Sequence, residues 1–411
     1  MKILILTAYD QPDRFQTRSF DYAEELLNLG HEITVFASSY CHFSKKDRLS
    51  GREKYKLENI NGVKTYWVKT TPYEGNGISR GLNMFYMFFR SLHLSKKIDK
   101  NFDAVIGTSS PPLISYAAYL ISKRKKASFV HDIRDVWPDS LVSLGALSEW
   151  NPVYIFFKLL EIFIYKKAHK ISSALPYVSK QVEKYGGSKS DISYIPTGIS
   201  FKKITKPVFK HKEISKNIKV MYLGGFARVH DIESIIKASE ILIDKGYKNF
   251  DFILIGYGKE KEKYKKHIIE SKNFSVEFRD SVEKNHVIPT LRTADILISA
   301  IVDLPVTKWG SNPTKLYDYM SSGIPVVCSF NSPNLPILDA DCGYSVEANS
   351  PQKIAECLIE FSLLEKEERF KMGLKGFEYA FKNYNLQTLA KSLEKTIEGS
   401  IKKKIALEKN E

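Results

Sequence analysis

The segments KILILTA (residues 2–8), RSFDYAEELLNLGH (18–31) and EITVFAS (32–38) follow one another near the start of the chain, and they decide the fold. The first and third are almost wholly apolar, and the second carries apolar side chains at helical spacing until Gly30 ends it. A buried strand, a helix and another buried strand are typical of a βαβ unit, in which helices cover both faces of a parallel sheet. This end of the chain therefore predicts a parallel α/β domain.

The same alternation continues through the rest of the chain. It is interrupted between 201 and 217, where apolar periodicity gives way to charge and proline, as in a linker. We therefore predict two α/β domains with doubly wound parallel sheets, over 1–203 and 218–385, joined by a linker over 204–217. The helix near 386–405 is expected to pack back on the first domain. The other strand-like runs are KTYWVK (64–69), DAVIGTS (103–109), ASFVHDI (127–133), ISYIP (192–196), IKVMYLGG (218–225), DFILIG (251–256), SVEFRD (275–280), DILISA (295–300) and IPVVCS (324–329).

Size and composition narrow the class of protein. The 411 residues exceed what one hydrophobic core usually supports, and a hydrophobic content of 43% is typical of globular domains. The four cysteines lack metal-type spacing and the chain opens without a signal-peptide pattern, so a cytoplasmic protein is expected. Lys158 and Glu161 interrupt the longest apolar stretch, which argues against a transmembrane helix.

The formal net charge of +15 favours an anionic partner such as nucleic acid, anionic lipid or a phosphorylated substrate. The sequence lacks a base-reading helix and an aromatic, basic sheet signature, so we do not expect nucleic-acid binding. Two aromatic segments, NMFYMFFRSLHLSKK (83–97) and VYIFFKLLEIFIYKK (153–167), end in lysines, as interfacial helices do. We expect the second to be core, and whether the first contacts a membrane stays open.

Charged side chains crowd the end of one strand that should be buried, FVHDIRDVWPDSL (129–141). Buried charges are costly unless they are paired or used in function. Because side chains alternate along a strand, Asp132 and Arg134 share one face, and His131 and Asp135 share the other. An internal Asp–Arg ion pair that pins the loop and a catalytic role are both open interpretations. The candidate catalytic residues are His131, Asp132, Arg134 and Asp135.

Ligands of open α/β sheets bind beyond the carboxyl ends of the strands. The first such turn, TAYDQPDRFQTR (7–18), lacks the glycine fingerprint of dinucleotide-binding domains, which argues against a dehydrogenase. Arg14 and Arg18 in this turn are candidates for binding an anionic acceptor. Solvated surface arginines would give the same pattern.

In the second half, YLGGFARVHDIESII (222–236) combines a strand, two glycines, a basic loop and a helix start. Glycine permits close backbone approach and a helix N-terminus favours an anion, so this turn is a candidate diphosphate site, although a plain strand-to-helix turn would look similar. IGYGKEKEKYKK (255–266) supplies another glycine turn, and SVEFRDSVEKN (275–285) carries an arginine that could border a nucleobase. The residues singled out are Gly224, Gly225, Arg228, His230, Gly256 and Arg279.

The segment NPTKLYDYMSSGIPVV (312–327) puts a lysine and an aspartate one helical turn apart, just before a strand. A helix starting near Pro313 would aim Lys315 at the same sheet edge as Gly225. Asp318 could then accept hydrogen bonds from the two hydroxyls of a ribose. An ordinary surface helix is the alternative. The donor-binding residues predicted here are Asn312, Thr314, Lys315, Leu316 and Asp318.

These segments resemble the retaining GT-B glycosyltransferases, particularly the family-four members that include the WbuB-like enzymes of bacterial surface-polysaccharide assembly. The resemblance runs over nearly the whole chain. It is carried by LGHEITVFASSYCHF (29–43), KTTPYEGNGISRGLNMF (69–85), IRDVWPDSL (133–141), YIPTGIS (194–200) and NPTKLYDYMSSGIPVV (312–327).

The resemblance implies a GT-B fold, with two Rossmann-like domains facing a central cleft. It implies that the second domain binds a nucleotide-sugar, with a UDP-sugar as the expected donor, and that the first binds the acceptor. The expected acceptor is an undecaprenyl-diphosphate-linked saccharide at the inner face of the cytoplasmic membrane, in O-antigen or capsule synthesis. Transfer would retain the anomeric configuration and need neither a metal nor a cofactor.

The sequence departs from the family pattern in several places. Asp318 falls where the family has its second glutamate, the ribose ligand, but Gly310 falls where it has the first. Arg228 and Lys315 are expected to replace the arginine and lysine that grip the diphosphate, and the glycine-rich acceptor loop is missing at 11–17. A nucleotide-sugar epimerase or a phosphorylase of the same two-domain architecture is the alternative function.

Overall fold

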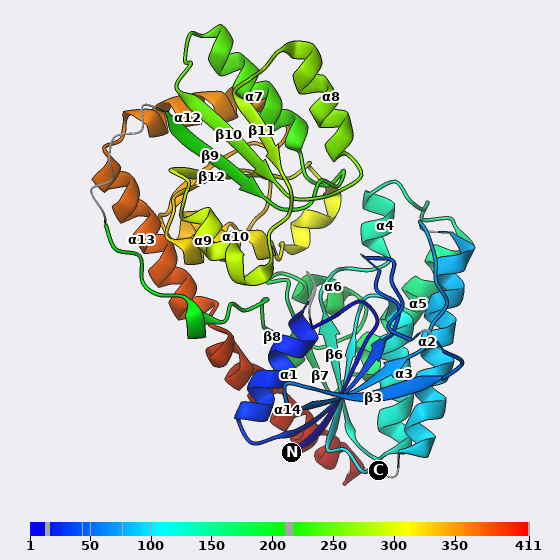
Figure 1. The fold of residues 1–411 in the computed structure, drawn as a ribbon. Helices are drawn as coiled ribbons and strands as arrows, with labels where there is room; N and C mark the ends of the chain where they lie inside the picture. Colours follow the sequence, from blue (N-terminus) through cyan, green and yellow to red (C-terminus); the bar gives the residue numbers. More distant parts are fainter. Residues whose placement is uncertain are drawn as a thin grey trace. The chain divides into compact units, whose positions relative to one another are not determined.

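The computed structural model describes residues 1–12, 17–42, 44–49, 51–75, 77–98, 100–209 and 217–409 (Figure 1). The chain forms two compact units, each built around a parallel sheet with helices on its faces. Unit 1 comprises Met1–Gly198, Trp309–Asn312 and Leu386–Glu411, and unit 2 comprises Ile199–Lys308 and Pro313–Asn385. The predicted α/β class is confirmed.

Unit 1 contains an eight-stranded sheet, in which every neighbouring pair is parallel except β3 with β4. The strand order is β3 (Tyr55–Ile60), β4 (Val63–Val68), β2 (Glu32–Ser38), β1 (Lys2–Thr7), β5 (Ala104–Thr108), β6 (Ser128–Ile133), β7 (Lys170–Ser173) and β8 (Ile192–Tyr194). The helices of unit 1 are α1 (Arg18–Asn28), α2 (Ile78–Lys97), α3 (Pro112–Arg124), α4 (Asp139–Ser143), α5 (Pro152–Lys167), α6 (Ser179–Lys184) and α14 (Leu386–Glu408).

Unit 2 contains a six-stranded sheet, and all of its neighbouring strands are parallel. The strand order is β11 (Val276–Arg279), β10 (Phe250–Ile255), β9 (Ile218–Leu223), β12 (Ile296–Ala300), β13 (Val326–Ser329) and β14 (Gly343–Val346). The helices of unit 2 are α7 (Ile232–Asp244), α8 (Lys261–Ser271), α9 (Val287–Leu291), α10 (Thr314–Ser322), α11 (Pro336–Asp339), α12 (Pro351–Leu363) and α13 (Lys366–Asn383).

The predicted βαβ unit is confirmed, because β1 pairs in parallel with β2 and α1 connects them. Three strands were missed by the sequence analysis. The antiparallel edge strand β3 is half exposed, and its alternating polar side chains lack the apolar run of a buried strand. β7 (KISS) and β14 (GYSV) contain serine, lysine or glycine in place of a run of apolar side chains.

The C-terminal helix α14 packs on unit 1, against α1, β6 and β7. Its side chains Leu389, Leu393 and Ile397 are buried in the same core cluster as residues of β1 and β2. The division between the units differs from the predicted boundaries, because Ile199 and the residues after it belong to unit 2. The described part of the predicted linker contacts that unit, and Arg292 Nη2 donates to the Thr205 carbonyl over 2.5 Å.

One prediction about the aromatic segments is wrong. We expected the helix at 153–167 to be core, but one side of α5 is open to solvent, and Leu159 is 63% exposed. α2 is likewise exposed along one side. In the part of the chain that the structure describes, no helix is both long and apolar enough to span a bilayer.

Candidate functional site

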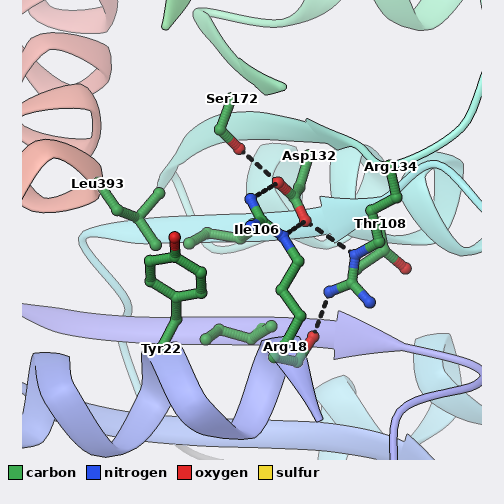
Figure 2. Close-up of a pocket in the computed structure, with 10 residues that line it drawn as sticks. Arg18, Tyr22, Ile106, Thr108, Asp132, Arg134, Ser172 and Leu393 are labelled. Atoms are coloured by element: carbon green, nitrogen blue, oxygen red, sulfur yellow. Dashed lines mark hydrogen bonds and ion pairs between the residues drawn. The ribbon is translucent and has the colours of Figure 1, made fainter. Parts of the chain in front are cut away.

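In unit 1, the charged side chains after β6 form an internal ion-pair network around Asp132 (Figure 2). Arg18 Nη2 lies 3.0 Å from Asp132 Oδ1, and Arg134 Nε lies 3.0 Å from Asp132 Oδ2. Ser172 Oγ on β7 donates to Asp132 Oδ1 over 2.8 Å. Figure 2 shows both guanidinium groups converging on this carboxylate. The three side chains line a small pocket of ≈ 20 Å³.

The outer ends of both arginines are also bonded inside unit 1. Arg134 Nη1 lies 2.6 Å from Asp10 Oδ1, and Arg134 Nη2 donates to Ser19 Oγ over 2.7 Å. Arg18 Nη1 donates to the Pro196 carbonyl over 2.8 Å. Arg18 is 6% exposed, so it holds the inside of unit 1 together rather than offering a cation to an acceptor. This setting disfavours the acceptor role predicted for Arg18, and Arg14 lies outside the described residues.

The network keeps Asp132 ionised. Burial by itself would raise the pKa of this carboxyl group, but the charges of Arg18 and Arg134 outweigh burial, and its pKa lies below the ordinary value. The internal Asp132–Arg134 ion pair suggested by strand alternation is confirmed. A catalytic role for these two residues stays a prediction.

His131 lies on the other face of β6, as alternation predicts. It is 2% exposed, and its Nδ1 lies 2.6 Å from Ser115 Oγ on α3. Burial lowers the pKa of the imidazole to about 4, so it is neutral at pH 7. Asp135 is partly exposed. Burial raises the pKa of its carboxyl group, and a hydrogen bond from Ser140 offsets only part of that rise. Asp135 is therefore better placed than His131 to contact a substrate.

In unit 2, Lys315 stands at the carboxyl edge of the sheet, in the first turn of α10. Its Nζ donates to Tyr222 Oη over 2.9 Å, lies 3.2 Å from His230 Nδ1, and is 4.5 Å from the centre of the Tyr222 ring. Tyr222 Oη in turn donates to the Gly225 carbonyl over 2.7 Å. A cation, a phenol and an imidazole therefore meet beside the Gly224–Gly225 turn.

The Lys315 amine is close to half-protonated at neutral pH. Burial lowers the pKa of Lys315 to about 7, although part of its side chain is exposed. Burial and the neighbouring Lys315 charge lower the pKa of His230 to about 3, so the imidazole is neutral. Among the described residues, no carboxylate offsets the effect of burial on this ammonium as Asp132 does for the arginines of unit 1. An anion that binds here would stabilise the protonated form of Lys315 through charge-assisted hydrogen bonds.

The glycines of this edge have two different roles. A Cβ on Gly256 would lie 1.8 Å from the Gly224 carbonyl oxygen, so that glycine lets two neighbouring turns touch. A Cβ on Gly224 would lie 2.8 Å from Tyr222 Oη and 3.0 Å from Lys315 Nζ. A Cβ on Gly225 would meet its nearest neighbours only at 3.9 Å. Of the predicted donor glycines, Gly225 is the one with open space beside it.

The other residues predicted for the donor are more scattered. Asp318 is partly exposed one turn beyond Lys315, and Thr314 is exposed at the start of α10. The Leu316 side chain is fully buried in the core of unit 2, so it cannot contact a ligand. Asn312 belongs to unit 1, where its Nδ2 donates to Thr197 Oγ1 over 2.9 Å.

Two predicted arginines point to solvent in this structure. The Arg228 side chain is 91% exposed and lies 3.6 Å from Glu260. Arg279 on the edge strand β11 pairs with Glu277 at 2.7 Å. Neither arginine belongs to the group formed by Lys315, Tyr222 and His230. Sequence reasoning missed Tyr222, whose signal was a tyrosine two residues before the glycine pair, near the end of an otherwise apolar strand.

A shallow, open hollow of ≈ 520 Å³ lies near the carboxyl ends of β12 and β13 in unit 2. It is lined by Asp303, Leu304, Pro305, Thr307, Lys308, Asn331, Ser332 and Pro333. Most of its exposed lining is apolar, with a few polar side chains between, as is common for ligand pockets.

Solved structures share this fold over nearly the whole chain. HepE of Anabaena, in complex with UDP-glucose, has a TM-score of 0.69 and 12% identity, covering 97% of this chain and 99% of its own. WaaG, a glycosyltransferase involved in lipopolysaccharide biosynthesis, has a TM-score of 0.70 and 14% identity, covering 97% and 99%. These structural similarities show that the protein has the GT-B fold.

Sequence comparison adds the family. A model described as Glycosyltransferase Family 4 matches residues 16–203, and one described as Glycosyl transferases group 1 matches residues 217–362. An uncharacterized glycosyltransferase of Methanocaldococcus jannaschii is 26% identical over 250 residues, 60% of this chain and 62% of the relative. The chain thus spans about three fifths of that relative's length. With one glycosyltransferase model on each unit, the chain belongs to the GT-B glycosyltransferases.

Proposed function

We propose that the protein transfers a sugar from a nucleotide-diphosphate-sugar, bound at the Lys315 edge of unit 2, to a saccharide acceptor. The observation that carries the proposal is the poised ammonium of Lys315, held by Tyr222 and His230 beside the open space at Gly225. A diphosphate is the ligand that such a cation, next to glycine backbone, suits best. Asp318, one turn farther along α10, is the proposed ribose ligand.

The proposed reaction needs little from the protein beyond binding and charge stabilisation. The bond between the sugar carbon and the diphosphate oxygen breaks, the acceptor hydroxyl oxygen bonds to that carbon, and the leaving phosphate takes the hydroxyl proton. Protonated Lys315 stabilises the negative charge that develops on the leaving diphosphate. Retention of configuration and independence from metals and cofactors stay predictions.

The comparisons support some finer assignments more than others. HepE was solved with UDP-glucose, which supports a UDP-sugar as the donor. WaaG acts in lipopolysaccharide biosynthesis, which supports a lipid-linked saccharide acceptor in O-antigen or capsule assembly, at the inner face of the cytoplasmic membrane. Both family models describe glycosyltransferases, so the epimerase and phosphorylase alternatives are disfavoured.

Ligand binding tests the proposal directly. The melting temperature is measured with UDP, GDP and dTDP and with their common sugar esters, and hits are titrated by calorimetry. A rise in melting temperature with one nucleotide class is expected, because a ligand that binds the folded state stabilises it. Failure of every nucleotide to bind would remove the donor site, and with it the proposed function.

The affinity for UDP is expected to fall as the pH rises above 7. Lys315 loses its proton in the free protein near pH 7, while the bound diphosphate holds the protonated form, so affinity falls by up to about tenfold per pH unit. His230 is neutral throughout, and burial raises the pKa of Tyr222 and that of Cys328, to about 12 for the thiol, so neither titrates. Calorimetry in two buffers measures the proton taken up; affinity that is constant from pH 7 to 9 would contradict the assignment.

Gly225→Ala is expected to weaken UDP binding about tenfold while leaving the melting temperature unchanged. The new methyl group makes only ordinary contacts within the protein, but it occupies space next to the proposed phosphate position. Gly224→Ala is the matched comparison, and it is expected to lower the melting temperature because its methyl crowds Tyr222 and Lys315. Unchanged UDP affinity in Gly225→Ala would place the diphosphate elsewhere.

A further inference from the structure

One side of α2 is a stripe of exposed apolar side chains. Ile78 is 86% exposed, Leu82 51%, Phe85 41% and Phe89 61%. They recur every three or four residues and so lie on one face of the helix. The same stripe ends at its C-terminal side in two exposed lysines, Lys96 and Lys97.

α5 repeats this arrangement. Val153 is 50% exposed, Phe156 49%, Leu159 63% and Phe163 36%, again at helical spacing. Its stripe also ends in two exposed lysines, and Trp150, just before the helix, is 89% exposed. Apolar side chains at this density on a solvent-facing helix mark an interaction surface.

The two stripes form one surface, because α3 lies between α2 and α5 and packs against both (Figure 1). A series of aromatic ring contacts through Tyr116 of α3 joins them. The distances between ring centres are 5.0 Å for Phe89 and Phe88, 5.7 Å for Phe88 and Tyr116, and 5.8 Å for Tyr116 and Phe163. We call this the α2–α5 face. It is defined by Ile78, Leu82, Phe85, Tyr86, Phe89, Val153, Ile155, Phe156, Leu159 and Phe163.

The charges of the three helices are almost all positive. α2 carries four lysines and arginines, α3 two and α5 three, whereas their one acidic residue is Glu161. Glu161 is buried and lies 2.6 Å from Lys158 Nζ, so it does not offset the field outside. Two copies of this face would bring cation against cation, which disfavours self-association through it.

We propose that the α2–α5 face docks on an anionic phospholipid bilayer. Its aromatic and aliphatic side chains enter the boundary between headgroups and acyl chains, and the lysines at the helix ends contact lipid phosphates. The chain then lies on the membrane surface through unit 1. In bringing unit 1 to a lipid-linked acceptor, this inference rests on the proposed function, but the test below does not use sugar transfer.

The test is flotation of the full-length protein with vesicles. The wild-type protein is expected to bind vesicles that contain phosphatidylglycerol, and not pure phosphatidylcholine vesicles. Phe89→Ser with Leu159→Ser is expected to lower the partition coefficient at least about tenfold, because two apolar side chains no longer enter the lipid. Replacing Lys96, Lys97 and Lys166 by Gln is expected to lower it about fivefold per lysine at low salt and little at high salt.

Matched controls come from exposed residues of unit 2. Phe274 is 92% exposed and Leu363 78%, so Phe274→Ser with Leu363→Ser removes the same kind of surface and should leave flotation unchanged. Lys245→Gln with Lys248→Gln serves as the control for charge. Circular dichroism and the melting temperature check that each variant is folded.

Three outcomes would overturn the proposal. The first is wild-type protein that fails to float with phosphatidylglycerol vesicles, and the second is α2–α5 variants that float like the wild type. The third is a wild-type protein that forms a dimer and binds no vesicles, and that becomes a monomer on Phe89→Ser with Leu159→Ser. The result is independent of donor binding. Flotation without UDP affinity would refute the proposed function and keep the membrane face, and UDP affinity without flotation would do the reverse.

Discussion

Lys315→Met is expected to lower the affinity for UDP at least about a hundredfold while the protein stays folded. The substitution removes the cation that the proposed diphosphate contacts, and the loss of one partner from such a pair costs about 2–5 kcal/mol. Methionine keeps the length of an unbranched side chain but loses the contact of the ammonium with the Tyr222 ring. Calorimetric titration measures the loss, and Asp318→Ala, which removes the proposed ribose ligand, is expected to give a smaller one, about tenfold.

The same substitution should stabilise the protein without ligand. The pKa of Lys315 falls from 10.5 to about 7 on folding, so the folded state bears the cost of the buried charge in full below pH 7. That cost fades as the pH rises from 7 to 10.5, where the folded protein has lost the proton and the unfolded chain still holds it. Lys315→Met is therefore expected to raise the free energy of unfolding by about 1–3 kcal/mol at pH 6, and by less at pH 9.

Two results would contradict this view of Lys315. Wild-type affinity for UDP in Lys315→Met would show that the cation does not hold the donor. A loss of stability at pH 6 would show that Lys315 braces unit 2, as an ordinary structural lysine would. Lys248→Met, at an exposed lysine of the same unit, is the control and should change neither quantity.

Asp132→Asn is expected to destabilise unit 1 by about 3–5 kcal/mol. The change keeps the size of the side chain but leaves Arg18 and Arg134 with Asp10 as their remaining charged partner in the network, in a buried setting. Urea unfolding monitored by fluorescence measures the effect. Because the pKa of Asp132 is depressed on folding, its contribution is present above the ordinary value of 3.8 and is lost as the pH falls below it.

The control for Asp132→Asn is an ion pair with a similar distance between nitrogen and oxygen, but with a carboxylate that is exposed to solvent. Lys261 Nζ lies 2.9 Å from Asp280 Oδ1, but the Asp280 side chain is fully exposed. Asp280→Asn should therefore leave the free energy of unfolding nearly unchanged. If the two substitutions cost the same, burial of the Asp132 network would not be the source of its stabilising effect.

Local sequence patterns were sufficient for most of the fold. The apolar runs at β1, β2 and β9 and the amphipathic helices between strands have periods that follow from backbone geometry, so each could be read within about ten residues. The strands that escaped prediction, β3, β7 and β14, are half exposed or lack a run of apolar side chains. The aromatic run of α5 led us to expect a core helix, because the sequence does not show which side of a helix its neighbours leave uncovered.

The sequence by itself therefore determined the class of fold, the two-unit organisation and the kinds of side chain that gather at strand ends. Tertiary structure decided which of those side chains are paired. Arg18 reaches Asp132 across 114 residues of sequence, and Lys315 reaches Tyr222 across 93. Arg18 is neutralised inside unit 1 and Lys315 is left as a poised cation, because the charge state of a buried group depends on the partners that the sheet order brings to it, and these are distant in the chain.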